Sequence, residues 1–253
     1  MIVAYPMSNK AKSLELCRVF ISGCGGVVAN ASNRNLLPGN AFFYGVDESN
    51  VHLFRQARTG VARDWYYCDN AYFDSTRQQY FRITRNRLQH SGYGSSDMAR
   101  FRKLNIQITP WKDTGKHIVV CPQSDEFMRT IVGFNGDWCA ETVAALASLT
   151  DRPVKLRTWG RDKNKLAATL AADLMDAYAL VTWSSAAAVT AVLAGVPVVV
   201  LSADCAAMPM SGAMSKLEAL PRRDRSVWSG VLADNQWTLD EFKDGTAWKM
   251  LNG

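Results

Sequence analysis

The stretch from residue 179 to residue 201, ALVTWSSAAAVTAVLAGVPVVVL, constrains the fold more than any other part of the chain. Apolar runs of strand length stand at its two ends, and a small-residue helical segment, residues 186–194, lies between them. Ser184 and Ser185 come directly before this segment, and a Gly-Val-Pro corner follows it. A buried strand, a helix and a second buried strand in this order predict a β-α-β unit in a parallel sheet.

The same stretch is long enough to be tested as a membrane span, because about 20 consecutive apolar residues can cross a bilayer. Pro197 would break such a helix, and Ser184, Ser185 and Thr190 interrupt its apolar character. We therefore expect two strands and a helix here, and no membrane span. The first residues, MIVAYPMSNKAK, lack the basic start and the long apolar run of a signal peptide.

The rest of the chain repeats the alternation of strands and helices. The chain has 253 residues, 48% of them hydrophobic, which is enough for one large domain or two small ones. Two alternating runs flank a polar, glycine-rich middle, so we expect an α/β fold of two Rossmann-like domains that face a cleft. The expected domains are residues 1–110 and 111–237, followed by a tail helix in residues 238–253 that packs back on the first domain. The expected strands are residues 2–5, 41–46, 64–68, 80–84, 117–121, 154–158, 179–183 and 196–201, and the expected helices are residues 10–21, 48–59, 137–149, 165–175, 186–194 and 238–251.

Six cysteines and three histidines are spread along the sequence without a Cys-x-x-Cys pair. Buried, reduced thiols are the expected state, which fits a cytoplasmic protein. The spacing of these residues assembles no zinc site, so no metal is expected.

Three predicted strands are followed by groups that suit an anion. Pro122 and Ser124 follow the strand at residues 117–121, Arg157 stands near the end of the next strand, and Ser184 and Ser185 open a helix. The carboxyl ends of parallel strands share one edge, and a helix N-terminus there suits a phosphate. Arg157 could equally be a solvated surface residue. No G-x-x-x-x-G-K-[ST] or G-x-G-x-x-G motif is present, and the GCGG run at residues 23–26 is interpreted as a turn.

The amino-terminal half offers an acidic candidate. Asp69 follows an aromatic strand, where its carboxylate could take a proton from an acceptor hydroxyl. A turn or N-cap aspartate is the alternative. Beyond it, basic and aromatic residues alternate, and the formal net charge is +6 with a pI of about 9.0. Such a segment suits nucleic acid, although an exposed loop has the same composition. The candidate contacts are Arg82, Arg85, Arg87 and Tyr93.

Several of these segments together resemble a known family. VVCPQS, DRPVKLRT, the stretch at residues 179–201, DNQWTLDEF and YYCDNAYF are similar to a group of phage and bacterial proteins related to GT-B glycosyltransferases and capsular-polysaccharide transferases. The resemblance implies a nucleotide sugar in the second domain and no metal for transfer. Thr182, Ser184 and Ser185 correspond to the diphosphate turn of that group, Arg157 to its cationic strand end, and Pro122 and Ser124 to its first loop. The sequence departs from the group at Trp183, where a histidine is usual, and at Thr190, where a glutamate is often found.

The favoured function is transfer of a sugar from a UDP- or GDP-linked donor to a hydroxyl, with Asp69 as the base. The charge, the arginine-rich middle and the phage-like relatives favour a hydroxymethylated pyrimidine in DNA as the acceptor. A saccharide in capsular or cell-envelope polysaccharide is the alternative. Trp183 and Thr190 leave open a non-catalytic module that binds nucleotides or nucleic acid. A sugar-nucleotide epimerase on the same fold is the third interpretation.

Overall fold

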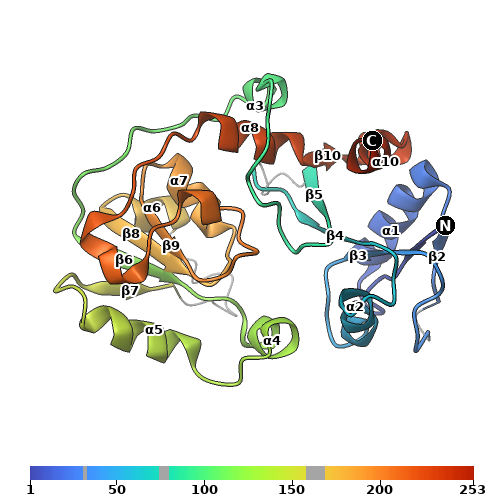
Figure 1. Ribbon diagram of the computed structural model, residues 1–253, viewed down its shortest axis with the longest axis horizontal. Coiled ribbons are helices and arrows are strands. Elements are labelled where there is room, and N and C mark those ends of the chain that lie inside the picture. Colours follow the sequence, from blue (N-terminus) through green and yellow to red (C-terminus); the bar gives the residue numbers. More distant parts are fainter. Residues whose placement is uncertain (31–32, 74–79, 158–168) are drawn as a thin grey trace. The chain divides into compact units, whose positions relative to one another are not determined.

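The chain folds into two α/β units, each built on its own sheet (Figure 1). The computed structural model describes residues 1–30, 33–73, 80–157 and 169–253. The first unit consists of Met1–His90 and Leu232–Gly253, and the second of Ser91–Val231. Residues 91–110, which we expected in the first domain, fall within the second unit, and residues 232–237 fall within the first. One reason is that the backbone N–H of Thr109 donates to the carbonyl of Leu193 at 2.8 Å, which ties this segment to the second unit.

The second unit contains the β-α-β arrangement expected at residues 179–201. Its four strands lie in the order β7-β6-β8-β9, and all neighbours are parallel. The strands are β6 (His117–Cys121), β7 (Val154–Leu156), β8 (Ala177–Thr182) and β9 (Val198–Val200). The helical elements are α3 (Ala99–Lys103), α4 (Asp125–Phe127), η1 (Met128–Val132), α5 (Trp138–Ala147), α6 (Leu170–Leu174), α7 (Ala187–Leu193), η3 (Met208–Met210), η4 (Met214–Ala219) and α8 (Ser226–Asp234), which continues into the first unit.

Helices cover both faces of this parallel sheet. α5 lies on one face and α6 and α7 on the other, as Figure 1 shows, which is the arrangement that right-handed crossovers give for this strand order. The helix expected at residues 137–149 is observed as α5, and Asp137 caps it, because its carboxylate accepts a hydrogen bond from the N–H of Ala140 at 3.0 Å. The predicted helix at residues 165–175 is observed as α6, and its first four residues lie outside the described ranges.

The first unit has a six-stranded mixed sheet in the order β10-β5-β4-β3-β1-β2. β2, β1, β3 and β4 are parallel, whereas β5 and β10 are each antiparallel to their neighbours. The strands are β1 (Ile2–Ala4), β2 (Val27–Val28), β3 (Asn40–Tyr44), β4 (Trp65–Asn70), β5 (Tyr80–Arg85) and β10 (Gln236–Thr238), and the helices are α1 (Ala11–Cys24), α2 (Val51–Arg58), α9 (Leu239–Lys243) and α10 (Thr246–Asn252).

Alternating side chains of β3 anchor a helix on each face of this sheet. Phe42 stacks on Phe20 of α1 with ring centroids 4.1 Å apart, and Phe43 meets Phe54 of α2 edge to face at 5.2 Å. Successive side chains of a strand point to opposite faces, so neighbouring phenylalanines serve separate cores. All these rings are almost completely buried, which makes the first unit a three-layer α/β structure.

The tail differs from the single helix expected over residues 238–251. It begins with strand β10, continues as α9 and then turns at Gly245, which has a φ of +81° and starts α10. A left-handed residue ends one helical run and lets the chain change direction. The side chains of Trp237, Phe242 and Ala247 are buried in the core of the first unit.

The described part of the chain contains no helix with the length and apolar character needed to cross a bilayer. All six cysteines are free thiols, and four of them are buried: Cys17, Cys68, Cys121 and Cys205. Burial raises the pKa of Cys17 and of Cys121 to about 12 each, so both thiols stay protonated at neutral pH.

Candidate functional site

The predicted anion-binding groups lie at one edge of the second unit's sheet. β6 pairs in parallel with β7 and with β8, with Val120 opposite Leu156 and Cys121 opposite Thr182. The segments that follow these strands therefore leave the sheet at the same edge. This edge, which we call the β6-β7-β8 edge, carries Pro122, Ser124, Arg157, Thr182, Ser184 and Ser185.

The hydroxyls at the end of β8 belong to an ordered turn. Thr182 is fully buried, and its hydroxyl donates to the carbonyl of Cys121 at 2.6 Å and accepts from the N–H of Ser185 at 3.2 Å. The half-buried Ser185 accepts a hydrogen bond from the N–H of Ala187 at 3.2 Å. A serine that accepts one hydrogen bond still has its own hydrogen to donate. Thr182 thus shapes the turn, and Ser185 is the hydroxyl that can meet a ligand.

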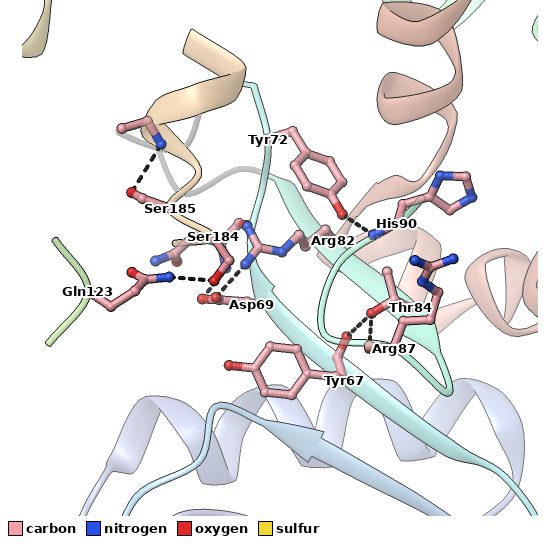
Figure 2. A network of polar contacts seen from close by, with 12 residues as sticks. Tyr67, Asp69, Tyr72, Arg82, Thr84, Arg87, His90, Gln123, Ser184 and Ser185 are labelled. Atoms are coloured by element: carbon pink, nitrogen blue, oxygen red, sulfur yellow. Dashed lines mark hydrogen bonds and ion pairs between the residues drawn. The ribbon is translucent and has the colours of Figure 1, made fainter. Parts of the chain in front are cut away.

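Gln123 joins this edge, although the sequence analysis did not single it out. Its side-chain amide donates to the hydroxyl of the buried Ser184 at 2.7 Å, as Figure 2 shows. The contact links the loop after β6 to the turn after β8. The sequence could have indicated Gln123, because it lies between Pro122 and Ser124, two residues predicted to bind the ligand.

Ser124 has a local structural role. It is exposed, and its hydroxyl caps α4 by accepting from the N–H of Phe127 at 3.1 Å. Asp125 and Glu126 follow it and are also exposed. Two carboxylates beside a phosphate are unfavourable, so Ser124 is a weaker donor-site candidate than Ser185.

Arg157 is held in an ion cluster that the sequence did not reveal. Its guanidinium pairs with the carboxylate of Asp173 on α6, and Lys155 of β7 pairs with the same carboxylate. Burial by itself raises the pKa of Asp173, but the hydrogen bonds and charges of Lys155 and Arg157 outweigh it, and the net pKa lies below the ordinary value. Two cations and one carboxylate leave a net positive charge next to the β6-β7-β8 edge.

This cluster gives a testable stability effect. We expect Asp173→Asn to lower the free energy of unfolding by about 2 kcal/mol near pH 7, because it leaves two cations without their shared carboxylate. The lowered pKa means that this stabilisation is present above the pKa of the unfolded carboxyl and is lost as the pH falls through the folded value. The difference between the parent and the variant should therefore shrink in acid, which denaturant titrations at several pH values would measure.

Asp176→Asn is the matched control, since Asp176 follows α6 and pairs with Lys116 at 3.3 Å on the exposed surface. We expect a change of well under about 1 kcal/mol for this surface pair. Equal effects of the two substitutions would show that the buried cluster contributes nothing special.

Asp69 lies inside β4 and not in a turn or at a helix N-cap. It is directly opposite Arg82 in the antiparallel β4–β5 pair, and one carboxylate oxygen accepts from Nη2 of Arg82 at 2.7 Å (Figure 2). The other oxygen accepts from the N–H of Asn70 at 2.7 Å. The side chain of Asp69 is 36% exposed, so its carboxylate remains accessible to solvent although two hydrogen bonds fix its orientation.

The four residues predicted to contact nucleic acid do not form one basic surface. Arg82 is only 5% exposed, which removes its guanidinium from direct contact with a large ligand. Arg85 is exposed but pairs with Asp64 at 2.8 Å, and Arg87 is partly buried. Tyr93 is 70% exposed and belongs to the second unit. In β5 the residues from 81 to 84 are all buried, and only Arg85 at the end of the strand is exposed, so this strand is part of the core and not a basic surface.

The two departures from the resembled family have different surroundings. Trp183 is half buried, and its side chain packs against the hydrophobic core of the second unit. Thr190 is exposed on α7. Packing accounts for Trp183, and Thr190 has no such structural explanation. No group of three or more histidine, cysteine, aspartate or glutamate side chains comes together within the described ranges.

No protein-family model and no curated protein matches the chain. Among the solved structures with a similar fold are two of one protein. One is Thermosulfurimonas dismutans KpsC, titled a beta Kdo 2,7 transferase, with a TM-score of 0.50, 11% identity and coverage of 98% of this chain and 99% of that chain. The other, titled a beta Kdo 2,4 transferase of the same protein and organism, has a TM-score of 0.53, 12% identity and coverage of 94% and 92%. At such identities the likeness shows a shared mixed α/β fold with two sheets.

Proposed function

We propose that the chain is a glycosyltransferase that moves a sugar from a nucleotide-sugar donor to a hydroxyl group of a saccharide. The observation that carries the proposal is a fold shared, over almost the whole chain, with two structures titled as Kdo transferases. A fold hosts many chemistries, so the residues of the candidate site have to supply the remaining support. In this proposal the two units correspond to the two Rossmann-like domains of a GT-B-type enzyme.

The proposed donor site is the β6-β7-β8 edge of the second unit. A nucleotide sugar carries phosphate groups, which favour hydroxyl and amide donors next to a net positive charge. Ser185 and Gln123 supply the donors, while Lys155 and Arg157 outnumber Asp173 in charge. Pro122, Thr182 and Ser184 shape the surrounding turns, and Ser124 has the weakest support. A UDP- or GDP-linked sugar is the proposed donor, and no metal or other cofactor is part of the proposal.

The proposed base is Asp69 of the first unit. During transfer the acceptor oxygen forms a bond to the anomeric carbon, and the bond from that carbon to the nucleotide phosphate oxygen breaks. The acceptor proton passes to the carboxylate of Asp69, and the nucleotide leaves with the negative charge. An exposed carboxylate that is held by hydrogen bonds suits this step.

We favour a saccharide acceptor of the capsular-polysaccharide type over a DNA base. The two solved structures are titled for Kdo transfer, and neither title names nucleic acid. Of the arginines expected to contact DNA, Arg82 is buried and paired with Asp69, Arg85 is paired with Asp64 at the surface, and Arg87 is partly buried. Both observations reduce the support for a hydroxymethylated pyrimidine.

A transfer assay tests the proposal. The protein is incubated with UDP-, GDP- and CMP-linked sugars, including activated Kdo, and with either an oligosaccharide or DNA containing hydroxymethylated pyrimidine. A mass increase of the oligosaccharide by one sugar supports the proposal, whereas modified DNA supports the alternative acceptor. Donor binding without release of the nucleotide indicates a non-catalytic module, and an isomerised donor without acceptor indicates an epimerase.

Ser185→Ala tests the donor site. Loss of a hydrogen bond to a charged phosphate is expected to weaken donor binding about 10-fold, because such bonds contribute about 1.5–3 kcal/mol. Isothermal titration calorimetry would measure the dissociation constant. Thr169→Ala is the matched control. The Thr169 hydroxyl likewise accepts a hydrogen bond at 3.2 Å, from the N–H of Ala172 in the first turn of α6. Unchanged donor affinity in Ser185→Ala would place the phosphate elsewhere.

A further inference from the structure

Arg82 is a buried cation in β5 of the first unit, opposite Asp69 near the end of β4. Only 5% of the residue is exposed, and its guanidinium has three kinds of partner. Nη2 donates to Asp69 at 2.7 Å, Nη1 donates to the carbonyl of Asn70 at 3.0 Å, and the ring of Tyr72 lies 5.0 Å from the guanidinium carbon (Figure 2). Within the described residues, Nε is buried without a hydrogen-bond partner. Asp69 is therefore the anion that compensates a costly buried charge.

The pair is asymmetric, and the asymmetry concerns the proposed base. The Arg82 side chain is 6% exposed, whereas the Asp69 side chain is 36% exposed. Burial lowers the pKa of Arg82, but the Asp69 carboxylate raises it enough for the net direction to be upward. A purely structural ion pair would not need to keep its carboxylate at the surface.

Resting on the proposed function, we propose that Arg82 is a positioning residue that holds the Asp69 carboxylate in a fixed orientation for accepting the proton of the acceptor hydroxyl. The cross-strand register sets the two side chains opposite each other, and the second hydrogen bond of Arg82, to Asn70, fixes the guanidinium relative to β4. A fixed base loses little freedom on reaching the transition state. Arg82 touches neither substrate in this proposal.

The surroundings of Asp69 allow this role to be read from pH dependence. Among the described residues of the first unit, the other titratable or charged groups near it are Tyr67 and Cys68 on β4, Tyr44 on β3 and Lys12 on α1. Burial is the largest cause that raises the pKa of Tyr44, Tyr67 and Cys68, so these groups stay neutral at and below neutral pH. The amine of Lys12 lies over the rings of Tyr44 and Phe81, at 5.8 and 5.3 Å from their centroids. Arg82 is the cation in direct contact with Asp69 at 2.7 Å.

Arg82→Gln removes the charge and keeps a side chain that can donate a hydrogen bond. We expect kcat to fall about 10-fold or more with little change in the KM for the donor, and the acid limb of kcat/KM to move to higher pH because the cation beside the proposed base is gone. Arg82→Lys keeps the charge but loses the two-pronged contact, so its acid limb should stay near that of the parent while kcat falls. Rate measurements over a range of pH on all three proteins give these values.

Arg152→Gln is the matched control, because Arg152 in the second unit has the same three kinds of partner. It pairs with Glu218 at 3.0 Å, donates to the carbonyl of Gly115 at 2.5 Å and lies 3.8 Å from the ring centroid of Tyr178. We expect this substitution to reduce stability and leave the acid limb in place. An acid limb that does not move in Arg82→Gln, or that moves equally in Arg152→Gln, would overturn the proposal.

A second measurement does not depend on transfer. The carboxyl carbon of Asp69, followed by ¹³C NMR through a pH titration, should take up its proton at a higher pH in Arg82→Gln than in the parent, and near the parent value in Arg82→Lys. Equal titrations in parent and Arg82→Gln would contradict the role of Arg82 even if transfer is observed. If the titration differs between Arg82→Gln and the parent but the parent transfers no sugar, the interaction of Arg82 with Asp69 is supported and the proposed function is rejected. If Arg82→Gln does not fold, the Lys variant decides through its kcat and its acid limb.

Discussion

Replacement of Asp69 by asparagine is expected to lower the rate of sugar transfer about 10²–10⁴-fold while the affinity for the donor stays the same. Asparagine has nearly the same shape, and its carbonyl oxygen can still accept from Arg82, so the β4–β5 register should be kept, although the buried Arg82 loses its compensating anion and the first unit becomes less stable. What is lost is a group that can take up the acceptor proton. Single-turnover transfer rates and donor titrations on the same preparation would separate the two effects.

The chain provides a close control for this experiment. Asp64 comes directly before β4 and pairs at 2.8 Å with Arg85 of β5, which resembles the pairing of Asp69 with Arg82. Asp64→Asn should leave transfer unchanged, because Asp64 has no part in the proposed site. Full transfer by Asp69→Asn would reject Asp69 as the base, and equal losses in both variants would indicate damage to β4 instead of loss of a proton acceptor.

The local patterns that predicted the fold were those in which one segment contains its own evidence. The strand at residues 117–121 is observed as β6 over the same residues, and the Asp137 cap of α5 is present. The strand is a single apolar run, and the helix has its capping side chain directly before its apolar positions. Strand β10 was missed because three residues form it, and its pairing partner β5 is about 150 positions earlier in the chain.

The candidate site shows the same limit more sharply. The β6-β7-β8 edge could be predicted, because parallel strands place their carboxyl ends together whatever the side chains are. The partner of Arg157 could not, since Asp173 reaches it from α6, and nothing near either residue marks the pair. Arg82 was predicted to contact nucleic acid because basic and aromatic residues are mixed around it in the sequence, yet it is buried, and Asp69 and Tyr72 supply the compensation that permits burial.

The GCGG run illustrates how a turn signal can conceal a packing requirement, and it gives the largest expected effect on stability. Gly23 lies in α1, and a Cβ atom there would come within 1.9 Å of the carbonyl oxygen of Phe242 and 2.8 Å of the backbone nitrogen of Gly245. Both neighbours are backbone atoms, so no side chain can rotate away. We expect Gly23→Ala to lower the free energy of unfolding of the first unit by about 3 kcal/mol, through overpacking against α9.

Gly25→Ala separates this clash from the general cost of replacing glycine. Gly25 ends α1 with a φ of +70°, and a Cβ there meets nothing within 4 Å, so only the backbone strain of about 1 kcal/mol is expected. Denaturant titrations would compare the two variants, and hydrogen exchange would follow the amides of the tail. Exchange in α9 and α10 should rise in Gly23→Ala and not in Gly25→Ala, because the tail docks through Phe242, whose ring centroid lies 5.5 Å from that of Phe20. Equal destabilisation by both substitutions, with unchanged exchange in the tail, would contradict this prediction. It would mean that α1 and α9 can move apart without loss of stability and that the packing of the tail on this unit does not depend on Gly23.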